Sequence, residues 1–448
     1  MTTKPIQDSL AMLRAGKFAG AKRLDLSCGL DHFPQEIYDL ADTLEILNLS
    51  GNNLSSLPND LTRLKKLKVI FCSENQFTHV PEVLGQCAEL TMVGFKANKI
   101  SQLAAEALPA KLQWLILTDN QLATLPSALG RCLQLQKLML AGNKLTYLPD
   151  EMAACTKLEL LRISANRFAS LPEWLLALPR LAWLAFAGNP LCSNIESSQL
   201  ANPRANQPIS QVDWASLQLQ QKIGEGASGV IYQAKWQGAE LDAQTVALKL
   251  FKGAMTSDGL PQSEMAACIA AGAHANLTST IGLLSGHPDN VSGLIMSLIK
   301  PSFSNLAHPP SLESCTRDVY ADATQFTLNH ALVIAQGVAS AMQHLHASGL
   351  MHGDCYAHNI LHHQDEGGCL LSDFGAASFM PTEHAQALQK IEVRAYGCLL
   401  EELLIRSLVS SDSAAKLQTL RNLQSACEQT EVALRPVFSQ ISQVLATL

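Results

Sequence analysis

The chain has 448 residues, which is too long for one ordinary hydrophobic core and predicts about two to four domains. Its hydrophobic fraction of 47% and charged fraction of 16% are typical of a globular protein and exclude a disordered one. The net charge is −7, with +1 in residues 1–200 and −8 in residues 201–448. We therefore do not expect nucleic acid as a partner, since binding to phosphate backbones requires a basic surface.

The N-terminus and the cysteines indicate the cellular setting. Residues 1–20 lack the apolar core of a signal peptide and predict a short N-terminal cap helix. No run of 18 uncharged apolar residues occurs, so the sequence predicts no contact with a membrane. The twelve cysteines form no CxxC pair and no zinc-type spacing, and Cys87, Cys132 and Cys155 are expected to be buried at equivalent positions. This cysteine usage predicts a reducing, cytoplasmic compartment.

The first half of the chain is repetitive. The segment LEILNLSGNNLSSLP starts at Leu44, and the same frame returns up to Leu181 in steps of 22 or 23 residues. Asn recurs in register at positions 52, 75, 98, 120, 143, 166 and 189. The pattern LxxLxLxxNxL resembles the leucine-rich repeat family, which implies an α/β solenoid over residues 21–195. Each unit is expected to bury one short strand's Leu residues, while its Asn satisfies backbone groups where the chain leaves the strand.

The alternate strand positions of the repeats are expected to face outward on a concave surface, and they are unusually apolar. The residues that stand out are Phe71, Trp114, Ile116, Met139 and Trp183. One interpretation is that these side chains only pack against one another along the stacked strands. The interpretation that we favour is a docking surface for a protein partner or for the chain's own second half.

A linker is predicted over residues 196–211, where Ser, Asn and Pro replace the repeat pattern. The second domain, over residues 212–448, opens with IGEGASGVIY, a loop that contains Gly224, Gly226, Gly229 and Val230. Strand-like segments flank this loop on both sides, whereas the dinucleotide-binding version requires a helix next. Glycine is needed in such a loop because the backbone must approach phosphates closely.

Further motifs follow in a fixed order. They are VALKLF with Lys249, SEMAACIAA with Glu264, HGDCYAHN with Asp354 and Asn359, and SDFG with Asp373. Together with the glycine-rich loop they resemble the eukaryotic-like protein kinases. The combination with leucine-rich repeats is an architecture also seen in bacterial proteins. The resemblance implies a compact two-lobed α+β kinase domain after the solenoid.

The resemblance also implies a role for each motif residue. Lys249, paired with Glu264, would hold the phosphates of ATP, and Asp354 would orient the acceptor hydroxyl and accept its proton. Asn359 and Asp373 would bind Mg²⁺. Met296 would be the gatekeeper, backbone groups of Ser297 and Ile299 would bond the adenine, and Leu361 would form the floor of its pocket. The full nucleotide-binding set is Gly224, Gly226, Gly229, Val230, Ala247, Lys249, Met296, Ser297, Ile299 and Leu361.

Several positions depart from the family pattern. Gly353 stands where the family has Arg, so no cation is available to hold a phosphate on the activation segment. Tyr356 stands where Ser/Thr kinases have Lys, so a positive charge near the γ-phosphate is missing. The activation segment is short and lacks the A-P-E motif, Glu392 replaces an Asp, and Arg435 lacks its usual Glu partner.

The sequence thus predicts an ATP- and Mg²⁺-dependent Ser/Thr protein kinase whose repeats recruit a partner or regulate the kinase. Two alternatives remain open. One is a pseudokinase scaffold that binds ATP without phosphotransfer, and the other is a kinase acting on a small molecule. Transfer of labelled phosphate from ATP into protein separates the three.

Overall fold

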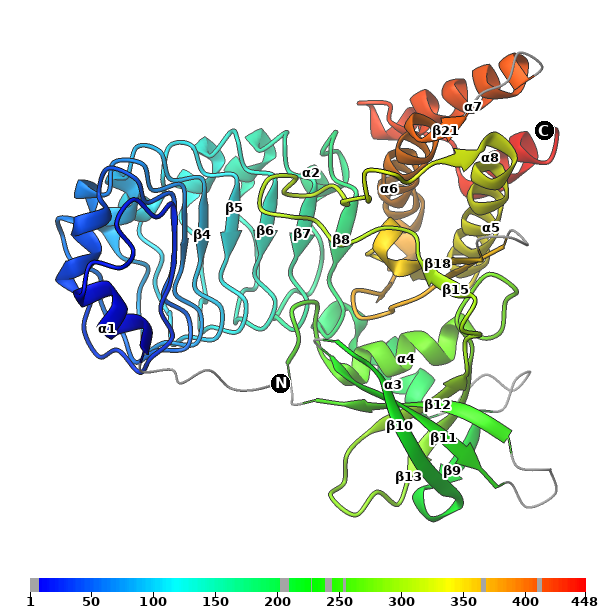
Figure 1. Ribbon diagram of the computed structural model, residues 1–448. Helices are drawn as coiled ribbons and strands as arrows, with labels where there is room; N and C mark the ends of the chain where they lie inside the picture. The colour runs from blue at the N-terminus through cyan, green and yellow to red at the C-terminus, as the bar shows by residue number, and fades with distance from the viewer. Residues whose placement is uncertain are drawn as a thin grey trace. The chain divides into compact units, whose positions relative to one another are not determined.

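The chain is seen here in a computed structural model (Figure 1). The structure describes residues 8–201, 209–226, 228–237, 244–252, 255–363, 368–408 and 413–448. Residues 1–7 of the expected cap and 202–208 of the expected linker lie outside the described residues. The chain forms two compact units, Met1–Arg180 and Leu181–Leu448.

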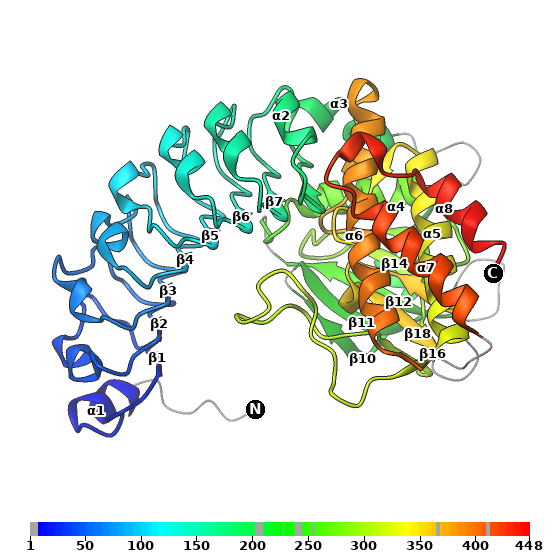
Figure 2. The ribbon, with the colours of Figure 1, turned by 90° about the horizontal axis from the view of Figure 1, so that it is seen from above.

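The first unit repeats one short motif after an N-terminal helix, α1 (Asp8–Arg14). Its strands are three residues long and pair in parallel, in chain order. They are β1 (Arg23–Asp25), β2 (Ile46–Asn48), β3 (Val69–Phe71), β4 (Met92–Gly94), β5 (Trp114–Ile116), β6 (Lys137–Met139) and β7 (Leu160–Arg162). Figure 2 shows these strands along the inner side of an arc.

Short helices connect the strands on the outer side of the same arc (Figure 2). They are the 3-10 helices η1 (Gln35–Leu40), η2 (Leu61–Arg63), η3 (Glu82–Gln86), η4 (Ala105–Ala107), η5 (Ser127–Arg131) and η6 (Asp150–Ala154), and α2 (Glu173–Leu176). Short helices suffice here because each repeat is only 22 or 23 residues long. The predicted solenoid is confirmed.

The Leu and Asn positions of the repeat behave as expected. The central residue of each strand from β1 to β7 is buried; it is Leu in most of them, such as Leu47 or Leu138, but Ile70 in β3 and Val93 in β4. Asn52 shows the role of the recurrent Asn: its Nδ2 donates to the carbonyls of Leu26 and Leu49, both at 2.8 Å, and its Oδ1 accepts from the amide of Leu30 at 2.9 Å. One side chain therefore satisfies backbone groups of two consecutive repeats that no strand ladder reaches. The three repeat cysteines are buried, as predicted.

The second unit begins inside the last repeat, with β8 (Trp183–Ala185) and α3 (Pro190–Ala201). Residues 196–201 of the expected linker are therefore helical. A six-stranded sheet follows, with the strand order β10-β11-β12-β14-β13-β9. Its members are β9 (Ser210–Asp213), β10 (Leu217–Glu225), β11 (Gly229–Trp236), β12 (Gln244–Phe251), β13 (Thr280–Ser285) and β14 (Gly293–Ser297).

A strand, not a helix, follows the glycine-rich loop, which excludes the dinucleotide-binding version of the motif. Helix α4 (Pro261–Ala271) lies between β12 and β13 in the chain and begins with Pro at its first position, where no backbone donor is needed. In Figure 1 the sheet and α4 form one end of the second unit.

The other end of the second unit is helical (Figure 1). Its helices are α5 (Leu328–Ala347), α6 (Ala385–Ile405), α7 (Ala414–Cys427) and α8 (Phe438–Leu445). Short strands accompany them: β15 (Phe303–Asn305), β16 (Phe326–Thr327), β17 (Leu350–Met351), β18 (Ile360–His363), β19 (Cys369–Leu371), β20 (Ser378–Phe379) and β21 (Ser407–Leu408). The 3-10 helices η8 (Ala357–Asn359), η9 (Thr382–His384) and η11 (Val432–Leu434) complete this part, and η7 (Trp214–Ser216) precedes β10. An α/β repeat unit is thus followed by a mixed α+β unit, as predicted.

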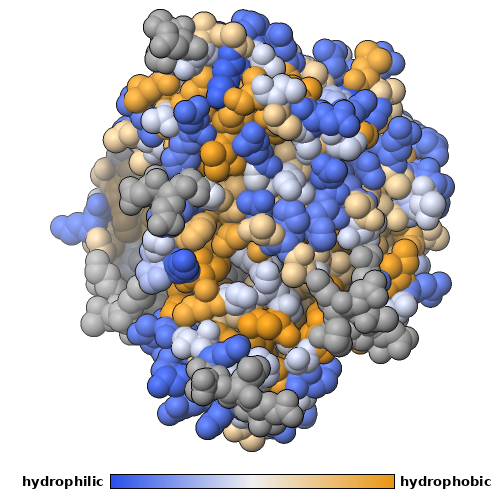
Figure 3. All heavy atoms as spheres, turned by 90° about the vertical axis from the view of Figure 1, so that its right-hand side faces the viewer, coloured by the Kyte–Doolittle hydropathy of each residue, from blue (hydrophilic) through white to orange (hydrophobic). Residues whose placement is uncertain are grey.

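The surface and the thiols agree with a globular chain. In Figure 3 the apolar residues form small groups that are interrupted by polar ones. Among the described residues, no helix has the length and apolar character needed to cross a bilayer. All twelve cysteines are free thiols, and eleven of them are buried.

Candidate active site

The glycine-rich loop lies directly against the strand that carries Lys249. The amide of Gly226 donates to the carbonyl of Gly229 at 2.9 Å and closes the turn between β10 and β11. A Cβ atom at Gly229 would lie 2.5 Å from the carbonyl oxygen of Leu250, so only glycine fits there. At Gly226 an added Cβ would meet nothing within 4 Å, so this side of the loop is open to a ligand.

Lys249 and Glu264 form the ion pair that the sequence predicts. Lys249 lies on β12 and Glu264 on α4, and the Nζ of Lys249 donates to Glu264 Oε1 in a nearly buried environment. Burial acts to lower the pKa of Lys249, but the charges of Glu264 and Asp373 outweigh it and raise this pKa. Lys249 is therefore cationic at neutral pH and faces both the α4 carboxylate and the carboxylate of the SDFG motif.

The loop between β17 and β18 brings Asp354 and Asn359 together. Asn359 Nδ2 donates to Asp354 Oδ2 at 2.7 Å and to the Asp354 carbonyl at 3.0 Å, which fixes the orientation of the carboxylate. Asp373 follows β19 with a left-handed backbone (φ 62°) and an exposed side chain. A non-glycine residue in this region is strained, and such residues cluster at functional sites.

A buried carboxylate on α6, that of Glu392, binds the backbone of the same loop. Glu392 accepts from the backbone amides of Gly353 at 2.7 Å and His352 at 3.2 Å, and its Oε2 lies 2.8 Å from Nε2 of His346. The sequence identified Glu392 as the replacement for an Asp. In the structure, Glu392 supports the backbone of residues 352–359, the loop that carries Asp354 and Asn359 and is called the catalytic loop below.

The residues that the family resemblance assigns to the adenine lie on β11, β12, β14 and β18 or, for Ile299, just after β14. Ala247 on β12 is buried and pairs in register with Met296 on β14. Ser297 ends β14, its amide is already bonded to the carbonyl of Ser279, and Ile299 follows two residues later. Leu361 lies on β18, next to the Asp354 loop. Val230 pairs with both Glu225 and Leu250, directly after the glycine turn.

The sequence missed the partner of His358. Asp318 accepts from the backbone amide of His358 at 3.0 Å, and its Oδ1 lies 2.7 Å from the ring Nδ1. Burial acts to lower the pKa of His358, but the bond to Asp318 and the negative charges of Asp318, Asp354 and Asp373 together outweigh it and raise this pKa. No signal in the sequence pointed to Asp318, because it precedes His358 by 40 residues and belongs to no motif.

Arg435 finds other partners in place of the missing Glu. Its guanidinium donates to the backbone carbonyls of Gln429 at 2.8 Å and Lys390 at 3.0 Å, and the residue is almost fully buried. This burial lowers the pKa of Arg435 to about 10. The residue thus connects the C-terminal segment to α6 without any A-P-E motif.

Trp183 contacts the chain's own second half, which is one of the two partners expected for the concave surface. It is 2% exposed, and its ring stacks on that of Tyr356 within the second unit. The Nε1 of Trp183 also donates to the carbonyl of Cys355 at 3.3 Å. The alternation of the strand correctly places this side chain opposite the repeat core, but the catalytic loop covers it.

The other four residues of this set lie on the first unit and are half-buried. Phe71 and Trp114 meet edge to face with ring centroids 6.3 Å apart, and the Nζ of Lys137 lies 4.2 Å from the Trp114 ring centroid. Ile116 and Met139 are neighbours in the strand register. Packing along the strands therefore covers part of this apolar surface and leaves part of it accessible.

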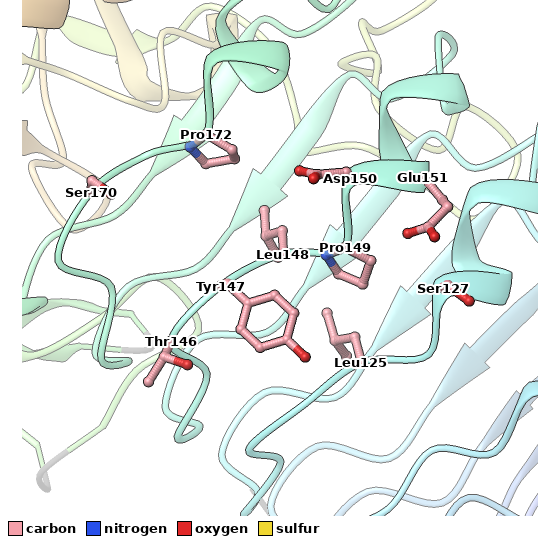
Figure 4. A pocket seen from close by; sticks show the side chains of 10 residues that line it. All are labelled: Leu125, Ser127, Thr146, Tyr147, Leu148, Pro149, Asp150, Glu151, Ser170 and Pro172. Atoms are coloured by element: carbon pink, nitrogen blue, oxygen red, sulfur yellow. The ribbon is translucent and has the colours of Figure 1, made fainter.

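A pocket also opens on the first unit, between the segments that follow consecutive strands (Figure 4). In Figure 4 the Tyr147 ring points towards Leu125, with Asp150 and Glu151 along the rim. Asp150 already accepts from Trp174 Nε1 at 3.1 Å. Similar hollows recur one repeat earlier, so the pocket is a feature of the repeat surface and not of the site described above.

Comparison with protein families agrees with this geometry. The family described as protein tyrosine and serine/threonine kinase matches residues 217–398. The leucine rich repeat family matches residues 43–64 and 110–168. The chain carries leucine-rich repeats and a protein kinase domain. The motif residues from Gly224 to Glu392 lie within the matched kinase region, and Arg435 lies beyond it.

Curated relatives share short stretches with this repeat kinase. Transforming growth factor beta activator LRRC32 of Mus musculus is 35% identical over 123 residues, which are 26% of this chain and 18% of that protein. Leucine-rich repeat and calponin homology domain-containing protein 1 of Mus musculus is 30% identical over 24% of this chain and 16% of its own length. A probable inactive serine/threonine-protein kinase of Dictyostelium discoideum, roco10, is 34% identical over 23% of this chain and 4% of its own length. The chain thus spans less than a fifth of each of these relatives.

Proposed function

We propose that the kinase domain is active and transfers the γ-phosphoryl group of ATP to a Ser or Thr hydroxyl of a protein. The observation that carries this proposal is the joint arrangement of Lys249, Glu264, Asp354 and Asn359. The ion pair is formed, and the Asp354 carboxylate is oriented by a 2.7 Å bond from Asn359. A protein that had lost phosphotransfer would have no need to keep all four groups in this order and geometry.

Each group has a task in this proposal. Lys249 holds the phosphates, and Glu264 keeps its ammonium group in place. Asp354 aligns the acceptor hydroxyl and takes up its proton as the oxygen attacks, while Asn359 prevents the carboxylate from rotating away. Because phosphoryl transfer needs little covalent help from the protein, positioning and charge supply most of the catalysis.

The residues present fit ATP and Mg²⁺. The open side of the turn at Gly226 leaves room for phosphates against the loop backbone, and Asn359 and the exposed Asp373 offer oxygen ligands of the type that Mg²⁺ prefers. When bound, Mg²⁺ neutralises charge on the phosphoryl group. The adenine would lie between Val230, Ala247 and Leu361, with backbone groups of Ser297 and Ile299 as its hydrogen-bond partners.

Tyr356 affects the rate expected for this site. Its ring, where Ser/Thr kinases have Lys, is buried under Trp183 and offers no cation to the transition state. His358, held by Asp318, lies near Asp354 and contributes positive charge in its protonated form. We therefore expect slower turnover than in kinases that have the Lys.

The repeats would supply the partner. The accessible part of the surface around Phe71, Trp114, Ile116 and Met139 combines aromatic and Met side chains, which concentrate binding energy in interfaces, with the cation Lys137. We propose that it recruits the protein that is phosphorylated.

Twelve free thiols support a reducing, cytoplasmic compartment. The proposed organisation is a cap (1–20), repeats (21–195), a linker (196–211) and the kinase domain (212–448), with the linker region beginning in helix α3 and ending in strand β9.

The test is incubation of the whole chain with labelled ATP and Mg²⁺, followed by mass-spectrometric mapping of the labelled residues. Label on Ser or Thr of a protein is the expected result. Tight ATP binding without any transfer would instead identify a pseudokinase scaffold, and label only in small molecules would identify the second alternative. Either outcome would overturn the proposal.

A further inference from the structure

We propose that the last repeat and its following helix, residues 181–201, act as a built-in positioning element of the kinase domain. This element would take over the task that a phosphorylated activation segment has in kinases with Arg at the position of Gly353. The proposal rests on the proposed phosphotransfer function. All of its contacts lie within the second compact unit, Leu181–Leu448.

The first contact explains why Gly353 is glycine. Its φ of +74° is in the left-handed region, and an added Cβ would lie 2.4 Å from the carbonyl oxygen of Ala376 and 2.8 Å from that of Leu184. Both obstacles are backbone atoms, which cannot move aside as a flexible side chain can. The backbone of β8 therefore lies beside the catalytic loop so closely that no Arg can occupy this position.

The second contact is aromatic and lies two residues after Asp354. Trp183 stacks on Tyr356 with ring centroids 4.2 Å apart and an interplanar angle of 7°. Its indole N–H donates to the Cys355 carbonyl at 3.3 Å. Stacking and hydrogen bonding together fix both the side chain and the backbone of the residues that follow Asp354.

The third contact holds the activation segment. The amide of Phe186 donates to the hydroxyl oxygen of Ser378 at 3.0 Å, and Ser378 is 0% exposed. Ser378 lies on β20, which pairs with β17, the strand that enters the catalytic loop. The segment after Asp373 is thus held in place without any phosphate. Because the hydroxyl of Ser378 is buried, another kinase cannot phosphorylate it in this structure.

The fourth contact reaches the helix that carries Glu264. Glu196 on α3 accepts from the hydroxyl of Ser263 on α4 at 2.9 Å through one carboxylate oxygen. Through the other it accepts from the amide of Gly188 at 2.9 Å. Glu196 is only 9% exposed, so this carboxylate is a bridge between the end of the last repeat and α4. Ser263 directly precedes Glu264, the partner of Lys249.

These contacts reach the three elements whose placement decides phosphotransfer: the catalytic loop, the activation segment and α4. In this proposal Trp183 and Glu196 are positioning residues, because they touch neither nucleotide nor acceptor and act through Tyr356 and Glu264. Residues 181–201 of the chain itself thus hold these three elements in place, and the last repeat is structurally part of the kinase domain.

The test uses the full chain with two conservative changes and their matched controls. Glu196→Gln removes the charge of the bridge, and Trp183→Phe keeps an aromatic ring but removes the indole donor. The controls are Glu89→Gln, which breaks an exposed pair with Lys111, and Trp174→Phe, which removes the indole donor to Asp150. The readouts are amide hydrogen exchange, the thermal midpoint, the dissociation constant for ATP, and kcat and KM for ATP.

For Glu196→Gln we expect exchange in residues 261–271 and the dissociation constant for ATP to rise roughly tenfold, with a similar fall in kcat/KM, since a charge-assisted hydrogen bond is lost. For Trp183→Phe we expect faster exchange in residues 350–358 and a lower kcat at an unchanged affinity for ATP. The controls should leave all of these values unchanged. Unchanged amide exchange in α4 and in the catalytic loop would overturn the proposal. A rise in exchange that is uniform over the chain and parallels a fall in the thermal midpoint would also overturn it, as would a higher kcat in either variant. If the wild-type chain transfers no phosphate, the proposed function fails, but exchange and ATP affinity still decide whether residues 181–201 position these elements.

Discussion

The indole ring of Trp183 lies parallel to the phenol ring of Tyr356, with centroids 4.2 Å apart, although 172 residues separate Trp183 from the carbonyl of Cys355 that its N–H binds. One residue belongs to the strand of a leucine-rich repeat, and the other occupies the position where Ser/Thr kinases have Lys. Both unusual residues of the catalytic loop, Gly353 and Tyr356, therefore have a common structural reason. The loop is adapted to the strand that lies against it.

The first prediction concerns the residues of the phosphotransfer site. Lys249→Met, Asp354→Asn and Asp373→Asn should each reduce transfer of labelled phosphate about 10²–10³-fold, because each removes a group that stabilises or orients charge in the transition state. Circular dichroism should remain unchanged. Lys235→Met, a change at an exposed lysine on the neighbouring strand β11, is the control and should retain full activity. Turnover at the wild-type rate in Asp354→Asn would refute the assignment of Asp354.

The second prediction concerns the activation segment. Ser378 and Thr382 are its only hydroxyl residues before Glu392, and of the two only Thr382 is exposed. Thr382→Ala should therefore keep the initial rate of phosphotransfer, because Gly353 offers no cation to hold a phosphate. Ser378→Ala should lower the thermal midpoint, since the buried amide of Phe186 loses its acceptor. A strong loss of activity in folded Thr382→Ala would show that a phosphate is needed after all.

The third prediction compares two neighbouring asparagines. Asn52→Ala should lower the free energy of unfolding of the repeat unit by about 2 kcal/mol or more, because it leaves buried backbone amides and carbonyls without partners. Asn53→Ala should change it by less than about 0.5 kcal/mol, since the Asn53 side chain is exposed. Urea titration followed by circular dichroism measures both. Equal changes in the free energy of unfolding would mean that the side-chain hydrogen bonds of the recurrent Asn do not stabilise the repeat unit.

The fourth prediction is a pH dependence of stability. The hydroxyl of Tyr38 donates to Asp60 Oδ1 at 2.6 Å and, with Arg63, holds the pKa of Asp60 below its usual value. The lowered pKa adds stability above the unfolded-state pKa of about 3.9, and this contribution is lost as the pH falls through the folded-state pKa. Asp60→Asn should thus be less stable than wild type at pH 7, and the difference should shrink below about pH 4. Asp119→Asn, an exposed Asp-to-Asn change at a backbone that Asn also tolerates, is the matched control.

The fifth prediction concerns recruitment by the concave surface. Trp114→Ala should raise KM for the protein acceptor identified by phosphosite mapping, because the Phe71 and Lys137 contacts to this ring are lost. The rate with a short peptide around the same phosphosite should stay unchanged, since the peptide does not reach the repeats. Tyr147→Ala, which removes an exposed aromatic ring elsewhere on the repeat unit, is the control. An unchanged KM for the protein acceptor would mean that the apolar surface around Phe71, Trp114, Ile116 and Met139 serves only packing along the strands.

Local and periodic features were accessible from the sequence alone. The repeat period, the buried Leu frame and the bonding role of the Asn residues follow from a pattern that returns every 22 or 23 residues. The order of the kinase motifs likewise predicted the pairing of Lys249 with Glu264, because Glu264 was the only carboxylate in the helix after Lys249. The repeat predictions succeed because spacing along one strand or loop determines which residues share a face, whereas the Lys249–Glu264 pair was accessible through the resemblance to a known family.

The tertiary structure alone decided how the last repeat and the kinase domain meet. The strand pattern gave Trp183 an outward direction, but only the fold shows that Tyr356 covers it. The bridge from Glu196 to Ser263, the support of His358 by Asp318 and the new partners of Arg435 join residues that no motif connects. Contacts between distant segments depend on how whole elements pack, and packing follows from the sum of many weak interactions that no short sequence pattern records.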